Sequence, residues 1–293
     1  MKTISIFGGT GFIGTELIGQ LAKQKVNINV YTRNINKADK LKVLPRVKLI
    51  QIKNLSNISE LLKGSDTVIN LVGILHETKK QNFLSAHKEW VEKIVLAIKK
   101  NRINRFIHLG AMQSSKYGPS NYLKTKYAGD QVIKNKLKNS AWTIFKPSIV
   151  FGENDKFINL FKKIISFLPI IFLISPKAKF QPVYVKDLVD IIIKSINDKK
   201  THSKIFNIAG PKSYSFREII ELIAVSKKKS IVIIPMNKKI SYLIVRLLEF
   251  LPIKIITRDN LKSMEVDNVS EINDSYCFKT NLMTLPAYLK IIR

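Results

Sequence analysis

The first half of the chain alternates short apolar runs with longer amphipathic stretches. The apolar and β-branched runs predict strands at 3–7, 26–32, 47–52, 67–72, 104–109 and 142–146. The stretches between them predict helices near 12–24, 36–43, 57–63, 83–101 and 120–138. Continuous apolar strands that alternate with helices are typical of a parallel sheet covered on both faces. With right-handed crossovers, the pattern predicts a doubly wound α/β fold.

The pattern changes after Pro147. Helical patterns cover 157–180 and 214–227, a strand turning into a helix covers 182–196, and a further strand covers 204–210. About the last 60 residues are mostly helical and basic. We therefore expect a sheet domain over 1–152 plus about 181–200, and a smaller, mainly helical C-terminal lobe over about 153–180 and 201–293.

The longest apolar stretch is "IISFLPIIFLIS", residues 164–175, and Pro169 interrupts it. A membrane-spanning helix needs about 20 apolar residues, so we expect a buried segment here. The alternative is an interfacial patch flanked by Lys162, Lys163, Lys177 and Lys179. Because the first strand begins near Lys2 with no secretory pattern before it, we expect a cytoplasmic protein without a signal peptide or transmembrane helix, or one peripheral on the inner membrane.

The charge is strongly basic, with 50 Lys and Arg against 21 Asp and Glu and a net charge of +29. Such a field favours anionic partners. The lysines are dispersed from Lys23 to Lys290 without a nucleic-acid motif, which argues against nucleic acid. Attraction to an anionic membrane surface or protein, and a merely compositional use of lysine, both remain open. The single cysteine, Cys277, excludes an internal disulfide and fits a reducing compartment.

A glycine-rich loop joins the first expected strand to the first helix. In "SIFGGTGFIG", Gly8, Gly11 and Gly14 are spaced three apart. These glycines suit a tight turn, close approach of a pyrophosphate and close helix–strand packing, respectively. The N–H groups at the helix start would bind the phosphates. The loop predicts an NAD(P)-binding Rossmann domain whose cofactor-binding residues here are Gly8, Thr10, Gly11, Phe12, Ile13 and Gly14.

The end of the second strand indicates which dinucleotide binds. NAD-binding proteins usually carry an acidic residue there, whereas this chain reads "VYTRNINKADK". Arg33, 19 residues after Gly14, can pair with a 2′-phosphate, and Lys37 adds charge. We therefore expect NADPH or NADP rather than NADH or NAD. The alternative is that both cations are solvated surface residues.

A candidate catalytic pair occurs in "SNYLKTKYAGD". Tyr122 and Lys126 are four residues apart on an expected helix and therefore share a face. A nearby ammonium group favours the phenolate, which suits Tyr122 to general acid–base chemistry, while Lys126 can also bind the cofactor ribose.

The glycine loop with Tyr122 and Lys126 resembles the extended or atypical branch of the short-chain dehydrogenase/reductase superfamily. Further segments resemble the nucleotide-binding (39 kDa-type) accessory subunit of respiratory complex I and its bacterial relatives: "VINLVGIL" (68–75), "FKPSIVFGENDKFIN" (145–159), "FQPVYVKDLV" (180–189), "NIAGPKSYSFREII" (207–220) and "TRDNLKSMEVDNV" (257–269). The resemblance implies a tightly held NADPH with a structural role.

The resemblance also implies further cofactor contacts. Leu71, Val72 and Gly73 would pass along the cofactor. Pro147, Ser148 and Ile149 would reach its nicotinamide end. Asn54 and Leu55 would lie near the adenine, although an Asp often occupies the position of Asn54 in the superfamily.

One departure from the superfamily concerns catalysis. Active reductases place a Ser or Thr at the end of the fifth strand, where this chain has Gly110 and Ala111. Ser114 or Ser115 in the following loop is the alternative source of that hydroxyl. The four histidines have no metal-ligand spacing, so we expect no metal site.

Three functions remain open. The favoured one is a module that holds NADPH and associates with respiratory complex I or another membrane assembly. The second is an active NADP-dependent oxidoreductase or sugar-nucleotide epimerase/dehydratase using Tyr122 and Lys126, with a link to quinone metabolism within that class. The third is a peripheral membrane protein that is stabilised by its nucleotide.

Overall fold

The computed structural model describes residues 1–52, 57–138, 140–249 and 256–292. The chain divides into two compact units. The first unit comprises Met1–Ala111, Thr125–Lys146 and Leu188–Phe206, and the second comprises Met112–Lys124, Pro147–Asp187 and Asn207–Arg293.

The first unit is built on a seven-stranded sheet in the order β11-β6-β5-β4-β1-β2-β3. The strands are β1 (Thr3–Phe7), β2 (Asn27–Thr32), β3 (Val47–Gln51), β4 (Thr67–Asn70), β5 (Arg105–Leu109), β6 (Ala141–Pro147) and β11 (Lys204–Ile208). The neighbouring pairs from β3 through β6 are all parallel. This order reverses between β1 and β4, as in doubly wound nucleotide-binding sheets, and it confirms the predicted fold class.

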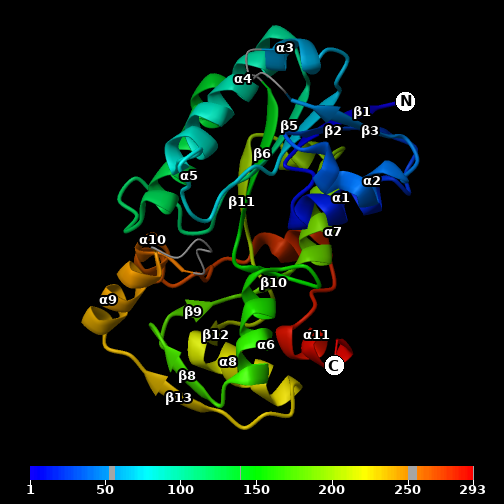
Figure 1. Ribbon diagram of the computed structural model, residues 1–293. Helices are drawn as coiled ribbons and strands as arrows, with labels where there is room; N and C mark the ends of the chain where they lie inside the picture. The colour runs from blue at the N-terminus through cyan, green and yellow to red at the C-terminus, as the bar shows by residue number, and fades with distance from the viewer. Residues whose placement is uncertain (53–56, 139, 250–255, 293) are drawn as a thin grey trace. The chain divides into compact units, whose positions relative to one another are not determined.

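Helices cover both faces of this sheet. They are α1 (Phe12–Leu21), α2 (Asp39–Lys42), α3 (Ile58–Leu61), α4 (Trp90–Lys100), α5 (Asn121–Lys136) and α7 (Val185–Ser195), together with short 3-10 helices at Ile35–Ala38 and Lys199–Thr201. Figure 1 shows α4 and α5 on one face and α1 and α7 on the other. A π-helical segment, Ser85–Glu89, leads into α4.

The packing of α4 shows why the sequence forms this layer. Val91, Ile94, Val95 and Ile98 follow the helical spacing of one face, and all four are buried in a cluster with residues of the sheet and of α5. Strands β4 and β5 are buried along their whole length, which explains why neither alternates between apolar and polar residues.

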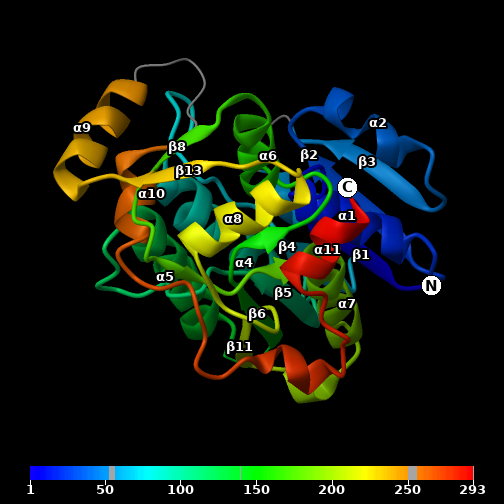
Figure 2. The ribbon, with the colours of Figure 1, turned by 90° about the horizontal axis from the view of Figure 1, so that it is seen from below.

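The second unit combines helices with three two-stranded sheets. Its helices are α6 (Phe157–Phe167), α8 (Phe216–Ser226), α9 (Lys238–Leu248), α10 (Arg258–Ser263) and α11 (Leu285–Ile291), with a 3-10 helix at Asp274–Phe278. Its paired strands are β7 (Val150–Phe151) with β10 (Val183–Tyr184), β9 (Lys179–Phe180) with β12 (Tyr214–Ser215), and β8 (Ile170–Leu173) with β13 (Val232–Pro235). Figure 2 shows β13 beside β8. A core of buried Phe, Ile and Leu side chains joins α6, α8 and α11 to these strands.

Two expectations for this region are wrong. The helix predicted over 157–180 ends at Phe167, because Pro169 cannot continue a helix, and the chain then forms β8 and β9. The apolar stretch 164–175 is not uniformly buried either. Ile171 and Leu173 point into the core, whereas Phe167, Leu168, Ile170 and Phe172 are exposed. In the part of the chain that the structure describes, no helix has the length and apolar character to span a membrane.

Candidate functional site

The glycine-rich loop begins where β1 ends. Gly8 has a φ of +77°, a left-handed conformation that favours glycine, and Gly11 N donates a hydrogen bond to Gly8 O over 3.1 Å. A Cβ on Gly14 would lie only 2.5 Å from Gly8 O. Helix α1 begins at Phe12 with Gly11 as its N-cap, and no side chain caps it. The first-turn N–H groups therefore remain for a bound anion.

The loop after β4 lies directly against this turn. A Cβ on Gly8 would lie 2.9 Å from Leu71 C and from Val72 N. Leu71 N donates to Phe7 O over 3.0 Å, which holds the two strand ends together. Leu71 and Val72 are half-buried and Gly73 is exposed. The structure thus brings the glycine loop and Leu71–Gly73 together at the point where the strand order reverses, the usual ligand position in such sheets.

The end of β2 carries a cation and no carboxylate. Tyr31 lies opposite Phe7 in the parallel register, so the next residues follow the same sheet edge as the glycine loop. Arg33 is exposed, and its Nη1 donates to Gln81 Oε1 over 3.1 Å. Lys37 lies in the 3-10 helix Ile35–Ala38. The predicted contacts Asn54 and Leu55 fall outside the described residues.

Lys126 is buried next to the loop after β4. Its side chain extends from α5, and Nζ donates to Leu109 O over 2.6 Å. A Cβ on Gly73 would lie 3.7 Å from Nζ. Burial lowers the pKa of Lys126 to about 8, although the charge of Asp130 acts in the opposite direction. An ammonium group in this position can bind hydroxyl groups of a ligand that lies along Leu71–Gly73.

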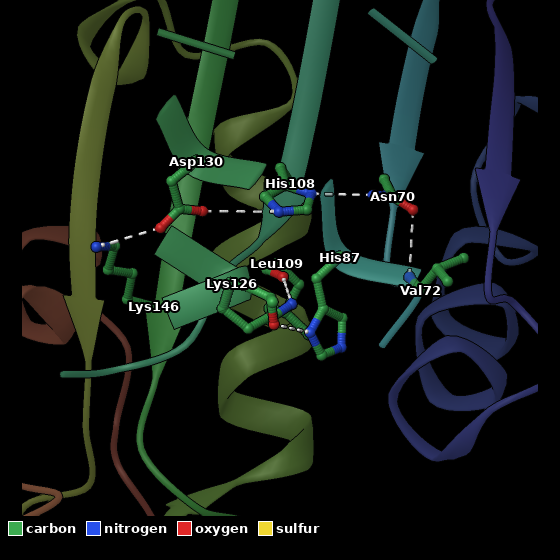
Figure 3. Close-up of polar contacts among 9 residues, drawn as sticks. Asn70, Val72, His87, His108, Leu109, Lys126, Asp130 and Lys146 are labelled. Atoms are coloured by element: carbon green, nitrogen blue, oxygen red, sulfur yellow. Dashed lines mark hydrogen bonds and ion pairs between the residues drawn. The ribbon is translucent and has the colours of Figure 1, made fainter. Parts of the chain in front are cut away.

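A buried polar network lies behind Lys126 (Figure 3). Asn70 Oδ1 accepts hydrogen bonds from Val72 N over 3.2 Å and from Trp90 Nε1 over 3.1 Å. Its Nδ2 therefore faces His108 Nδ1 over 3.0 Å, which places the imidazole proton on Nε2. That Nε2 lies 3.7 Å from Asp130 Oδ1, and Lys146 Nζ lies 3.2 Å from Asp130 Oδ2. Burial, followed by the charge of Lys126, lowers the pKa of His108, so its ring is neutral.

His87 joins this network from the π-helical segment before α4. Its Nε2 accepts from Ile74 N over 3.2 Å, and its Nδ1 lies 3.0 Å from Thr125 Oγ1. Burial, with a smaller effect of the Lys126 charge, lowers the pKa of His87 to about 3. The neutral ring thus positions the loop after Gly73. The sequence reasoning missed this role; the close approach of Gly129, where a Cβ would lie 2.1 Å from His87 O, is apparent only in three dimensions.

The position of the missing reductase hydroxyl is crowded. Gly110 and Ala111 directly follow β5. A Cβ on Gly110 would lie 3.0 Å from Asp130 Oδ1 and 3.2 Å from Lys146 Cγ. A serine or threonine at residue 110 would therefore require the buried network to shift.

The other candidate residues belong to the second unit. Tyr122 is half-buried, and its N–H donates to Asp259 Oδ2 over 3.0 Å. Pro147 O accepts from Met112 N over 3.1 Å. Asn268 Oδ1 accepts from Ser148 Oγ over 2.6 Å and from Ile149 N over 3.0 Å.

These contacts explain the segment "TRDNLKSMEVDNV". Thr257 and Asn260 form the capping box of α10. Asp259 accepts from Asn121 N over 2.8 Å as well as from Tyr122 N, so it caps the start of α5. The sequence reasoning noted the segment but missed the roles of Asp259 and Asn268 as anchors for the chain around Tyr122 and Ser148.

Comparison with known proteins agrees with this geometry. A family model described as NAD(P)H-binding matches residues 8–160. The chain is 30% identical over 226 residues to the mitochondrial NADH-ubiquinone oxidoreductase 40 kDa subunit of Neurospora crassa, covering 75% of this chain and 59% of that one. It is also 30% identical over 229 residues to the mitochondrial NADH dehydrogenase [ubiquinone] 1 alpha subcomplex subunit 9 of Arabidopsis thaliana, covering 74% and 56%, respectively. The chain thus spans less than two thirds of the length of these curated relatives.

Among solved structures, the fold is similar to that of an NADPH-dependent quinone oxidoreductase, QOR2, from Escherichia coli complexed with NADPH. The TM-score is 0.79 at 12% identity, and 99% of each chain is covered. The likeness at this identity concerns the fold alone. The two relatives, named as subunits of NADH-ubiquinone oxidoreductase and NADH dehydrogenase, confirm the resemblance inferred from the sequence. The chain belongs to the NAD(P)H-binding family.

Proposed function

We propose that the protein holds NADPH in a structural or assembly role associated with respiratory complex I or another membrane assembly. The observation that carries this proposal is the glycine loop against Leu71–Gly73, with Lys126 beside it, combined with a crowded position at Gly110. The first group of residues suits a dinucleotide. The second would bring the side chain that active reductases carry there within 3.0 Å of Asp130 Oδ1.

The residues fit the cofactor in a specific way. The N–H groups at the start of α1, from Phe12 and Ile13, would bind the pyrophosphate, because no side chain caps that helix end. Gly11 and Thr10 would let the phosphates approach the backbone. Lys126 would bind ribose hydroxyls, and Leu71, Val72 and Gly73 would pass along the cofactor. Pro147 and Ile149 at the nicotinamide end, and Asn54 and Leu55 near the adenine, stay predictions from the resemblance.

The choice of NADPH over NADH depends on Arg33. Its guanidinium is exposed at the end of β2, where Nη1 donates to the neutral side chain of Gln81. A guanidinium can replace that neutral contact with two charge-assisted bonds to a 2′-phosphate. Neither Tyr31 nor Thr32 offers a carboxylate to the ribose of NADH.

Holding the cofactor without turnover follows from the missing hydroxyl. Bound NADPH supplies a hydride, but a carbonyl substrate must also be polarised as it accepts that hydride. The loss of one such hydrogen bond costs about 2.7–4 kcal/mol of transition-state stabilisation. Ribose binding by Lys126 does not depend on that hydrogen bond, so cofactor affinity is unaffected.

The proposed partner is inferred from the names of the relatives. The fungal and plant proteins are named as subunits of NADH-ubiquinone oxidoreductase, and their alignment covers about three quarters of this chain. Association of this chain with an assembly of that kind is our inference from those names.

The test is to purify the protein, record the reduced-nicotinamide absorbance and add candidate carbonyl and quinone acceptors. We expect a bound signal that persists. Rapid loss of the signal in the wild type, but not in Tyr122→Phe, would overturn the holding role.

That outcome would instead support the second candidate function, an active NADP-dependent oxidoreductase or epimerase/dehydratase. The spacing of Tyr122 and Lys126 on α5 favours this candidate, because the two residues lie one turn apart on the same helix.

A further inference from the structure

The second unit carries an exposed apolar face on its β8–β13 sheet. Ile170 pairs with Val232 in the parallel register, and Phe172 pairs with Ile234. All four are exposed, Phe172 by 63% and Val232 by 59%, while the intervening Ile171 is buried. Two neighbouring strands therefore direct their large apolar side chains to the same outer face. Phe167 and Leu168, at the end of α6 just before β8, are exposed as well.

Helix α9 follows β13 along the chain (Figure 2). It carries a second apolar stripe. Ile240, Leu243, Ile244 and Leu247 have the spacing of one helical face, and all are exposed. The opposite side of the helix is buried at Ser241 and Val245. An amphipathic helix of a water-soluble protein normally buries its apolar stripe, whereas α9 exposes it.

The charged residues within the elements of this face are of one sign. Segments 157–180 and 225–248, which contain α6, β8, β13 and α9, include no Asp or Glu in their sequence. They contain ten cations: Lys162, Lys163, Lys177, Lys179, Lys227, Lys228, Lys229, Lys238, Lys239 and Arg246. Lys238 is paired with Glu265 over 2.7 Å from outside these segments, whereas Lys227–Lys229 form an exposed run at the turn that enters β13.

A hollow at the end of α6 shows how these cations meet the apolar face. Lys162, Lys163, Lys227 and Phe167 line it, together with Glu153 and Asp155. Asp155 is buried and accepts hydrogen bonds from Gly152 N and Ile158 N. Burial, and then the charge of Lys227, lowers the pKa of Lys162, whereas the charge of Asp155 acts in the opposite direction.

We propose that the second unit rests on an anionic lipid surface through the exposed apolar sides of β8, β13 and α9 and their lysines. Its exposed Phe, Leu and Ile side chains would enter the interface between headgroups and acyl chains, and the lysines would lie among lipid phosphates. A protein partner would have to supply a matching excess of carboxylates, whereas an anionic leaflet offers that charge everywhere. This proposal does not depend on the nucleotide, and it assigns membrane contact to the second unit alone.

The experiment measures binding of the purified full-length chain to vesicles of phosphatidylcholine, alone or mixed with phosphatidylglycerol. We expect binding to the anionic vesicles and loss of binding at high salt. The apolar variant Phe172→Ser with Leu243→Ser should bind at least about tenfold more weakly. Its matched control, Leu96→Ser with Ile272→Ser, replaces equally exposed apolar residues elsewhere and should bind like the wild type.

A charge variant tests whether the lysines contribute to lipid binding. Replacing Lys227, Lys228 and Lys229 by Gln should weaken binding about a hundredfold, because each interfacial lysine contributes about fivefold. Replacing the exposed Lys23, Lys25 and Lys48 by Gln is the control for net charge. Equal effects of both triple variants, or of both apolar variants, would overturn the proposal.

Two further readouts separate the explanations. All variants should retain NADPH and the wild-type circular dichroism, so loss of vesicle binding cannot be attributed to unfolding or to failure of the proposed cofactor role. Light scattering after size exclusion reports the oligomeric state. A dimer that the apolar variant converts to a monomer, without any vesicle binding by the wild type, would assign the face to a second copy of the chain and overturn the lipid assignment.

Discussion

Lys146 Nζ lies 3.2 Å from Asp130 Oδ2, and the Asp130 side chain is only 1% exposed. This ion pair joins β6 to α5 in the interior of the first unit, and the neutral ring of His108 faces the second carboxylate oxygen. The Lys146 ammonium group has little access to water there. The folded state therefore depends on the Asp130 carboxylate to neutralise this charge.

Removal of that carboxylate should therefore destabilise the protein strongly. We expect Asp130→Asn to lower the free energy of unfolding by about 3–5 kcal/mol, because it leaves Lys146 without its buried counter-charge. Asp190→Asn is the matched control, since it breaks the exposed pair with Lys194 on α7 and should cost about 0.3–0.5 kcal/mol. Chemical denaturation of the two variants measures both values. Equal losses would show that burial does not set the strength of the Asp130 pair.

Substitutions at two glycines of α1 should distinguish an effect on cofactor binding from an effect on helix stability. A Cβ at Gly14 would lie 2.5 Å from both Gly8 O and Gly9 Cα, whereas nothing lies within 4 Å of a Cβ at Gly19. Gly14→Ala should therefore displace the loop and weaken NADPH binding by at least about tenfold. Gly19→Ala should leave binding unchanged and raise stability by about 0.5–1 kcal/mol. Fluorescence titration with NADPH and thermal melts test the pair. Similar affinities for the two variants would exclude the loop from the site.

Arg33 should determine the preference for the phosphorylated dinucleotide. We expect Arg33→Gln to weaken NADPH binding about tenfold to a hundredfold, which corresponds to the loss of about 1.5–3 kcal/mol from charged hydrogen bonds. The affinity for NADH should stay the same. Titrations of both dinucleotides measure this difference, with Lys48→Gln on β3 as the control for net charge. Parallel losses for NADPH and NADH would place the 2′-phosphate elsewhere.

His87 should make the fold sensitive to acid. Its pKa is about 3 in the folded state, against 6.5 for the free side chain, so the unfolded chain binds more protons between these values. The stability associated with the neutral ring is present above about pH 6.5 and is lost as the pH falls toward about 3. Between about pH 6.5 and 5 this amounts to about 2 kcal/mol. We expect the wild type to lose that much more free energy of unfolding than His87→Gln over this interval. Curves that remain parallel would contradict the buried neutral state.

The centre of the sheet could be predicted from the sequence because β1, β4, β5 and β6 are buried on both faces. Their apolar runs are therefore continuous, and the helices between them carry a clear period. The apolar run in β8 was wrongly predicted to be part of a helix, because four apolar residues in succession fit a helix as well as a strand. Only the effect of Pro169 and the pairing with β13 decide between them. The domain boundaries expected from the sequence stay a prediction.

The glycine loop could be recognised locally, because its residues are close in sequence. The polar network behind Lys126 could not, because its members come from separate elements. Asn70 and His108 lie opposite each other in the register of β4 and β5, and each looks like an isolated polar residue in an apolar strand. The roles of Asp259 and Asn268 were missed for the same reason. They contact segments more than a hundred residues earlier in the chain.

The central claim is that the turn from β1 into α1 binds the diphosphate of NADPH. The most direct measurement is isothermal titration calorimetry of the nucleotide-free protein with NADPH, together with an assay for nucleotide released when the purified protein is denatured. We predict saturable binding at a single site, or a stoichiometric amount of NADP(H) in the denatured sample. A titration without heat for either NADPH or NADH, with no nucleotide released, would contradict the account.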